Sequence, residues 1–265
     1  MQVSGANVLV TGGSRGIGEA LAREFAAQGA NVCVVARSAD AIEKIAGEIG
    51  GSAITADLLD PAQVDGLADR VAAEFGDVDI LVNNAGLDAA GAFLASDPDV
   101  LRDVMRLNLE GSILLTRAFL PGMVERDRGH LVFVSSLAGT SGFASLATYC
   151  ATKAGLNNFT ASLRLELNST EIKTTLVAPG PVDTDMWDGL EEEPYNAGEL
   201  RRLGRLQMIP KISPAKLARR TVAAVEADRR HVRHPRRLSL TFWLGEAPRR
   251  MTEALLTGVK FDVPR

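Results

Sequence analysis

Short apolar runs alternate with longer segments of helical spacing along the first 180 residues of the chain. Strands separated by helices of ten or more residues need crossover connections, and these produce a parallel sheet with helices on both faces. The sequence therefore predicts an α/β fold with a doubly wound parallel sheet. Its strands are expected at Asn7–Thr11, Asn31–Ala36, Ser52–Ala56, Val78–Val82, Leu131–Ser135 and Ile172–Ala178.

The segments that follow these runs carry apolar residues at helical spacing. Helices are predicted at Ile17–Gln28, Ala39–Ile49, Pro61–Phe75, Asp99–Leu107, Gly111–Glu125, Ala147–Asn168 and Pro214–Ala227. The alternation stops at Pro179, but no linker or low-complexity stretch divides the chain. We therefore predict one domain over residues 1–265, with residues 183–210 and 229–265 as additions to its core.

Composition and charge narrow the class of protein. A net charge of −4 argues against nucleic acid as the main partner, and 46% apolar residues are ordinary for a globular protein. Cys33 and Cys150 form no metal-ligand spacing, so no metal site is predicted. No signal region is recognised, and the apolar stretches fall short of the ~20 residues that span a bilayer. A cytoplasmic location is therefore expected.

The segment Thr11–Gly18 lies where the first strand gives way to the first helix. Its G-x-x-x-G-x-G spacing lets the backbone turn tightly, and unpaired N–H groups at the start of a helix favour a pyrophosphate. The turn therefore predicts a dinucleotide site, although a glycine-rich turn without a ligand is the alternative. The candidate residues are Gly12, Ser14, Arg15, Gly16, Ile17 and Gly18.

The end of the second strand bears on which dinucleotide binds. NAD sites usually have an acidic residue there, about 20 residues after the glycine-rich turn, which binds the ribose 2′-hydroxyl. Here the chain has Ala36-Arg37-Ser38. The planar guanidinium of Arg37 suits a 2′-phosphate, and Arg15 offers a second cation. NADP(H) is therefore favoured over NAD(H), unless both arginines are only solvated surface charges.

Tyr149 and Lys153 are four residues apart, so they share one face of a predicted helix. A phenol has a pKa of about 10, and acid–base work near neutral pH requires roughly 4 kcal/mol of preference for the phenolate. One cation about 4 Å away contributes about that much at an effective dielectric constant near 20. Lys153 and an oxidised nicotinamide together are expected to make Tyr149 a proton donor and acceptor, although burial opposes this.

These segments resemble the short-chain dehydrogenase/reductase family, in its compact single-domain form, over residues 6–185. Several further motifs carry the resemblance, and their order along the chain makes it highly specific. They are Asp57-Leu58, Asn83-Asn84-Ala85-Gly86, Leu107-Asn108-Leu109, Ser135-Ser136 and Pro179-Gly180-Pro181-Val182-Asp183-Thr184. The resemblance implies a Rossmann-type fold and an oxidoreductase that transfers a hydride between NADP(H) and a carbonyl/secondary alcohol pair.

The resemblance also implies a role for each matching residue. Ser136 would polarise the substrate carbonyl, in preference to its neighbour Ser135. Asn108 would hold a water that connects Lys153 to solvent, and Lys153 would also bind the nicotinamide ribose. Further cofactor contacts would come from Asp57, Leu58, Asn83, Ala85, Gly86, Pro179, Gly180, Val182 and Thr184. The family further implies a homodimer or a homotetramer.

In this family the segment after Pro179 closes over the substrate, so residues 183–210 are expected to form a lid. Its apolar side chains favour a lipophilic ketone or a 3-oxoacyl or steroid-like substrate, unless they only pack against the domain. These side chains are Met186, Trp187, Leu190, Tyr195, Leu203, Leu206 and Met208.

A basic segment follows the lid. Between Arg201 and Arg237 there are twelve Lys and Arg residues but only two acidic residues, Glu226 and Asp228. The densest part, residues 229–237, leads into an apolar stretch. It is interpreted either as a solvated face beside a packed helix or as a docking surface for an anionic membrane or an acidic acyl carrier.

The remaining cysteines and histidines receive structural interpretations. Cys33 is predicted to lie in the core, and Cys150 to pack on another side of its helix from Tyr149. His130 is expected at the surface, and His231 and His234 in a basic loop.

Two other functions stay open on the sequence. One is a redox sensor that binds NADP(H) without turnover, and the other is a membrane-peripheral protein that uses the basic segment. The intact set of Asn108, Ser136, Tyr149 and Lys153 favours an active enzyme.

Overall fold

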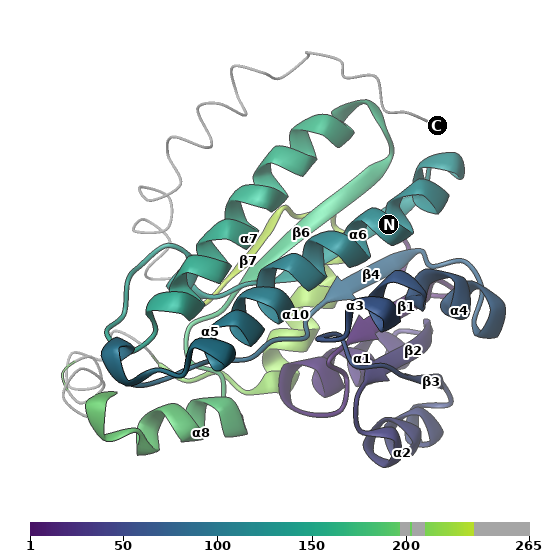
Figure 1. Ribbon diagram of the computed structural model, residues 1–265. Helices are drawn as coiled ribbons and strands as arrows, with labels where there is room; N and C mark the ends of the chain where they lie inside the picture. Colours follow the sequence, from purple (N-terminus) through teal and green to yellow (C-terminus); the bar gives the residue numbers. More distant parts are fainter. Residues whose placement is uncertain (197–201, 203–209, 236–265) are drawn as a thin grey trace.

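The computed structural model describes residues 1–196, 202 and 210–235 of the chain. Its centre is one seven-stranded parallel sheet with the strand order β3-β2-β1-β4-β5-β6-β7 (Figure 1). The strand order reverses beside β1, so the predicted doubly wound α/β fold is confirmed. The strands are β1 (Asn7–Thr11), β2 (Asn31–Ala36), β3 (Ser52–Thr55), β4 (Ile80–Asn83), β5 (Gly129–Val134), β6 (Ile172–Ala178) and β7 (His231–Arg233).

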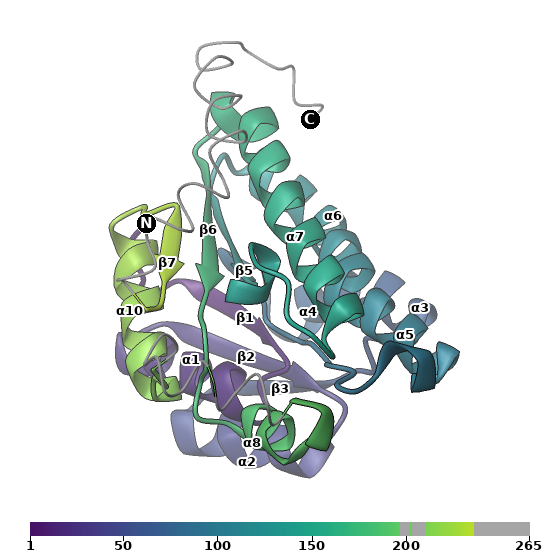
Figure 2. The same cartoon turned by 90° about the vertical axis from the view of Figure 1, so that its left-hand side faces the viewer.

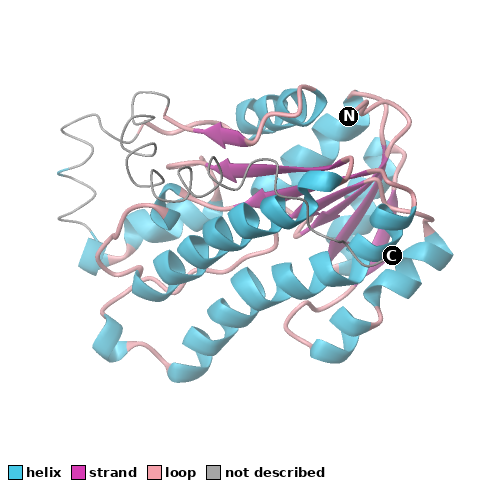
Figure 3. Cartoon of the chain, turned by 90° about the horizontal axis from the view of Figure 1, so that it is seen from above, coloured by secondary structure: helices cyan, strands magenta, loops and turns pink. Residues whose placement is uncertain are grey.

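Helices cover both faces of this sheet (Figure 2 and Figure 3). They are α1 (Gly16–Ala27), α2 (Ala39–Ile49), α3 (Pro61–Asp65), α4 (Leu67–Glu74), α5 (Pro98–Met105), α6 (Ser112–Glu125), α7 (Ala147–Glu166), α8 (Asp185–Glu192) and α10 (Pro214–Glu226). One face packs against α1, α2 and α10, and the other packs against α4, α6 and α7. Among the described residues, none of the helices combines the length and apolar character needed to cross a bilayer.

Alternating strand side chains supply the two apolar layers. In β1, Val8 and Val10 belong to the cluster under α1 and α10, whereas Leu9 belongs to the cluster under α6 and α7. The neighbouring β2 follows the same pattern, and Cys33 is fully buried beside Leu9, as predicted. Successive residues of a strand point to opposite faces, so a continuous apolar run is required for a strand that is covered on both sides.

Two helical segments differ from the prediction. The helix expected from Pro61 to Phe75 is divided at Gly66 into α3 and α4. Conversely, α5 and α6 are connected by a π-helical turn, Arg106–Gly111, where separate helices were expected. A π turn inserts a residue without ending the helix, so it shifts the apolar period and makes one continuous helical segment resemble two in the sequence.

The basic segment contains a strand that the sequence did not reveal. His231, Val232 and Arg233 pair with Leu176, Val177 and Ala178 of β6. The interpretation of His231 as a loop residue is therefore wrong. The strand has only three residues, and Val232 is the one buried residue among them, so the run carries almost no apolar pattern. Residues 236 and 237 of this segment lie outside the described residues.

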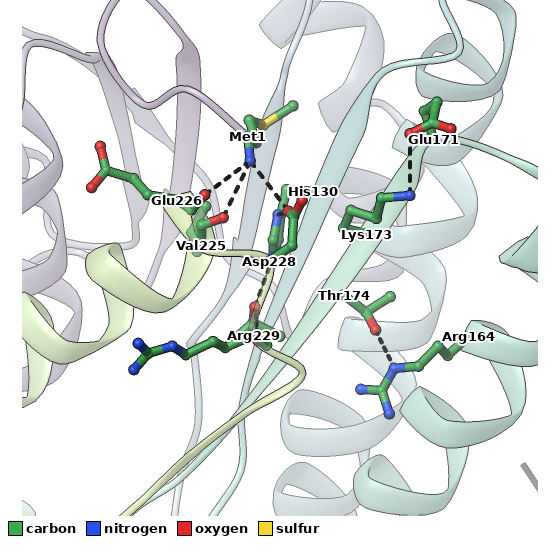
Figure 4. Close-up of polar contacts among 11 residues, drawn as sticks. Met1, His130, Arg164, Glu171, Lys173, Thr174, Val225, Glu226, Asp228 and Arg229 are labelled. Carbon is green, nitrogen blue, oxygen red and sulfur yellow. Dashed lines mark hydrogen bonds and ion pairs between the residues drawn. The ribbon is translucent and has the colours of Figure 1, made fainter. Parts of the chain in front are cut away.

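His130 is not at the surface, contrary to the prediction. It lies in β5 with no exposed area, because β6 and the chain after α10 cover it. Its Nε2 lies 2.8 Å from the Thr175 hydroxyl, and its Nδ1 lies 3.8 Å from the Asp228 carboxylate (Figure 4). Burial lowers the pKa of His130 to about 4, although the charge of Asp228 acts in the opposite direction. The ring is therefore neutral near pH 7.

This buried ring predicts a loss of stability in acid. The folded-state pKa of about 4 lies below the unfolded value of about 6.5, so the unfolded chain binds the proton more tightly. The free energy of unfolding therefore keeps its full value above pH 6.5 and decreases as the pH falls toward 4, by about 3 kcal/mol in total. Urea unfolding of the wild type and of His130→Gln at neutral and acid pH measures this loss. Equal acid losses in both proteins would contradict the assignment.

Candidate active site

One cavity of about 710 Å³ lies at the carboxyl ends of the strands. The turns that follow β1, β2, β3, β4, β5 and β6 all contribute to its wall. It is lined by eighteen of the residues singled out in the sequence: Gly12, Ser14, Arg15, Gly16, Ile17, Gly18, Arg37, Asp57, Leu58, Ala85, Gly86, Ser136, Tyr149, Lys153, Pro179, Gly180, Val182 and Thr184. The fold therefore brings the predicted dinucleotide turn and the predicted Tyr/Lys pair into one site.

The glycine-rich turn after β1 is shaped so that only glycine fits at two points. Gly12 has a φ of +65°, and a Cβ there would lie 2.8 Å from Ala85 Cα. A Cβ at Gly18 would lie 2.1 Å from the carbonyl oxygen of Gly12. No side chain caps the start of α1, whose first N–H groups need an acceptor. These features fit a phosphate group at the start of α1.

A hydroxyl joins this turn to the turn after β4. Thr11 Oγ1 donates to Val82 O and accepts from the N–H groups of Asn84 and Ala85, at 3.0, 3.0 and 3.2 Å. The Asn84 side chain donates to the carbonyl oxygens of Thr11 and Gly12 at 2.9 and 3.2 Å. The sequence alone does not indicate this role of Thr11 and Asn84, because the role depends on two strands about 70 residues apart in the chain.

Two asparagines expected at the site do not line the cavity. Asn83 is buried and donates to the Thr116 hydroxyl at 3.1 Å, so its neighbour Asn84 occupies the wall instead. Asn108 is fully buried in the π-helical turn, where its side-chain amide bonds both the N–H and the carbonyl of Leu87 at 2.7 Å. A Cβ at Gly86 would lie 3.1 Å from Asn108 Oδ1 and 3.7 Å from Lys153 Nζ, so Asn108 lies directly behind the cavity wall.

Two arginines stand at the dinucleotide end of the cavity. Arg37 follows β2 and is exposed, and none of the ion pairs in the described part of the chain involves it. Arg15 pairs with Asp185 of α8 at 3.0 Å, with both side chains largely exposed. An exposed ion pair of this kind contributes little stability, so a phosphate can replace Asp185 at low cost. The positions of both arginines fit a phosphorylated ligand.

Lys153 is a buried cation beside the catalytic candidates. Its side chain is only 4% exposed, and its Nζ donates to the Val134 carbonyl at 2.9 Å. Nζ also lies 5.5 Å from the centre of the Tyr149 ring. Burial lowers the pKa of Lys153 to about 8. The amine therefore still carries its charge at neutral pH.

Tyr149 and Ser136 form a pair of hydroxyls in the cavity. Burial raises the pKa of Tyr149 to about 12, and a hydrogen bond with Ser136 acts in the opposite direction. Lys153 by itself does not offset burial, since its amine faces the ring and is bonded to Val134. The pKa of Tyr149 therefore moves toward neutrality only if a bound ligand adds further positive charge.

Ser135 has a structural contact that separates it from Ser136. Its hydroxyl donates to Asn157 Oδ1 at 2.6 Å and is buried between β5 and α7. Ser136 instead lies on the cavity wall, where its hydroxyl accepts from the Ala138 N–H at 3.1 Å. This arrangement favours Ser136 as the group that meets a substrate.

Part of the expected lid covers the other end of the cavity. Met186, Trp187 and Leu190 of α8 line the wall, whereas Tyr195 is 60% exposed. Lys211 holds α8 through a 2.9 Å ion pair with Glu191 and packs over the Trp187 ring. The other apolar residues predicted for the lid, Leu203, Leu206 and Met208, lie outside the described residues.

Comparison with known proteins identifies the family. The family model described as short chain dehydrogenase matches residues 6–194. The 3-oxoacyl-(acyl-carrier-protein) reductase FabG of Escherichia coli (strain K12) is 35% identical over 212 residues, which cover 79% of this chain and 84% of that protein. The chain belongs to the short-chain dehydrogenase/reductase family. It is therefore a nicotinamide-dependent oxidoreductase that acts on CH–OH and C=O groups.

Solved structures of short-chain dehydrogenases/reductases share the whole fold. One from Streptomyces avermitilis is 33% identical with a TM-score of 0.79, and the match covers 97% of this chain and 99% of that one. A variant of the actinorhodin polyketide ketoreductase, solved with NADPH, is 29% identical with a TM-score of 0.78, covering 88% of this chain and 97% of that one. The resemblance inferred from the sequence motifs is confirmed.

Proposed function

We propose that this short-chain dehydrogenase/reductase uses NADP(H) to interconvert a ketone and a secondary alcohol on a lipophilic substrate. One observation carries the proposal: the hydrogen-bonded hydroxyls of Ser136 and Tyr149 share a cavity with the glycine-rich turn and with Arg37. A redox sensor would need no such pair of hydroxyls. The complete set of acid–base groups therefore favours turnover over sensing.

The proton chemistry belongs to α7 and to the end of β5. When bound, the nicotinamide supplies or accepts the hydride. Ser136 donates a hydrogen bond to the substrate oxygen, and Tyr149 donates its proton to the same oxygen. Lys153 stabilises the resulting phenolate through its buried charge. Asn108 holds the Leu87 backbone beside Lys153, and we place the water that relays protons to solvent there.

The dinucleotide would lie along the strand ends. The first N–H groups of α1 would bind the pyrophosphate, assisted by the turn residues Gly12, Ser14, Arg15, Gly16, Ile17 and Gly18. Asp57 and Leu58 would contact the adenine. At the nicotinamide end the contacts would come from Ala85, Gly86, Tyr149, Lys153, Pro179, Gly180, Val182 and Thr184. Asn83 supports this wall only indirectly, through its buried bond to Thr116.

The choice of NADP(H) over NAD(H) rests on the residue after β2. The exposed Arg37 offers a planar donor for a 2′-phosphate, and no carboxylate stands there to bind a ribose hydroxyl. The similar actinorhodin ketoreductase was solved with NADPH, which supports the same choice.

The substrate end of the cavity is apolar. The side chains of Leu146, Met186, Trp187 and Leu190 favour a lipophilic ketone, and similarity to the FabG reductase favours a 3-oxoacyl chain among such substrates. For an acyl-carrier substrate, the basic residues 229–237 would supply a docking surface, and the same charges would also bind an anionic membrane.

A homodimer or homotetramer fits the surface around α5. Phe93, Leu94, Val100 and Met105 are all more than 40% exposed, although they are large and apolar. Such a cluster is typical of a surface that contacts another protein. A single domain in a cytoplasmic location remains our prediction for the chain.

Replacing Tyr149 tests the proposed reaction. Tyr149→Phe removes the proton donor but keeps the ring, so kcat for NADPH-dependent ketone reduction should fall at least about 100-fold. NADPH consumption with a panel of lipophilic ketones measures kcat, and NADPH fluorescence on binding verifies that the cavity is intact. Turnover that survives the substitution unchanged would refute the role of Tyr149.

Replacing Arg37 tests the choice of cofactor. Arg37→Ala removes a charge-assisted contact to the 2′-phosphate, so kcat/KM for NADPH should fall about tenfold or more, while NADH is little affected. The matched control is Arg219→Ala, which removes an exposed arginine on α10 that does not line the cavity. Equal losses for the two cofactors would contradict the 2′-phosphate contact.

A further inference from the structure

Asp88 is a carboxylate on the cavity wall for which the proposed reaction has no role. It follows the turn after β4, and the preceding residue, Leu87, is held by two 2.7 Å hydrogen bonds with the Asn108 side chain. Its half-buried side chain shares the cavity with Ser136 and Tyr149. The backbone beside Asp88 is therefore held in place, and its carboxylate lies in the same cavity as the reacting groups.

The other acidic side chains of the cavity have partners. Among the described lining residues, three are acidic: Asp57, Asp88 and Asp185. Asp57 accepts from the Leu59 N–H at 3.0 Å, and Asp185 pairs with Arg15 at 3.0 Å. No described Lys, Arg or His forms an ion pair with Asp88, which bonds only its own N–H group. Among the described residues, Asp88 therefore has no bonded cation, and its carboxylate is available to a positively charged ligand in the cavity.

The surroundings disfavour the negatively charged forms of both Asp88 and Tyr149. Burial raises the pKa of Asp88, and the charge of Arg15 opposes this only in part. The charge of Asp88 in turn raises the pKa of Tyr149. The other described charges nearby are engaged, because Arg15 binds Asp185 and Lys153 binds the Val134 carbonyl. A cation placed between Asp88 and Tyr149 would favour both ionised forms.

We propose that Asp88 binds a positively charged group of the substrate, so that ketones with an ammonium group beside the carbonyl are preferred. This specificity rests on the carbonyl reduction proposed above. An ammonium donates to the Asp88 carboxylate while the apolar wall of Leu87, Leu146 and Trp187 holds the rest of the molecule. The same ammonium offsets the repulsion between Asp88 and the Tyr149 phenolate.

Two matched ketones test this specificity. They share an aryl-alkyl frame, but one carries a dimethylammonium group beside the carbonyl and the other carries a neutral isopropyl group of the same shape. With NADPH, the wild type should show at least about a tenfold higher kcat/KM for the ammonium ketone. Asp88→Asn and Asp88→Ala should reduce this preference to within about threefold, mainly through KM.

The control variant is Asp69→Asn, which removes the same charge from an exposed position on α4 outside the cavity wall. It should retain the preference for the ammonium ketone. The specificity is overturned if the wild type shows no preference, or if the preference survives both Asp88 substitutions. Reduction of the neutral ketone in all variants would show that the proposed reaction stands even when the specificity fails.

A binding measurement needs no turnover. The NADPH complex is titrated with an arylalkyl dimethylamine that has no carbonyl, and the fluorescence of bound NADPH reports occupancy. The wild type should bind this amine at least about tenfold more tightly than Asp88→Asn does. Equal affinity in the two proteins would overturn the role of Asp88, whether or not any ketone is reduced.

Discussion

The cavity depends on the hydroxyl of Thr11, which holds the ends of β1 and β4 together. It bonds Val82 in one strand and the N–H groups of Asn84 and Ala85 in the turn beyond it. These two strands are neighbours where the strand order reverses, which is where open α/β sheets bind ligands. Because Gly12 lacks a Cβ, the two turns can approach closely enough to form one continuous wall. The phosphate end and the reacting end of the site are thereby fixed relative to each other.

Burial then sets the electrostatics of the reacting end. It raises the pKa of Tyr149 to about 12 and lowers that of Lys153 to about 8, so both groups are pushed toward their neutral forms. The hydrogen bond from Ser136 acts against this, and the charge of Asp88 acts with it. The protein alone therefore keeps the phenol protonated. Acid–base chemistry at Tyr149 requires additional positive charge, from the oxidised nicotinamide and, in our proposal, from the substrate.

Local patterns predicted the fold and most of the cavity, because a parallel sheet brings the carboxyl ends of its strands together. The apolar runs of β1, β2 and β6, the glycine spacing and the Tyr149/Lys153 pair all follow from neighbouring residues. The predictions that were wrong concern contacts between segments that are distant in the sequence. His130 is buried by the chain after α10, about 100 residues later, and β7 is too short to show an apolar period. Likewise, whether Asn83 or Asn84 faces the cavity depends on how β4 ends, which the sequence does not encode locally.

The ionisation of Tyr149 with and without oxidised cofactor tests the central claim most directly. Phenolate absorbance is recorded against pH for the wild type and for Tyr149→Phe, and the difference isolates this one residue. In the free enzyme the difference should show no phenolate below about pH 10, since the pKa is about 12. Oxidised NADP should lower that value by about three, as one cation about 4 Å away does at an effective dielectric constant near 20. A phenolate near neutral pH in the free enzyme, or no change on adding the cofactor, would contradict this account.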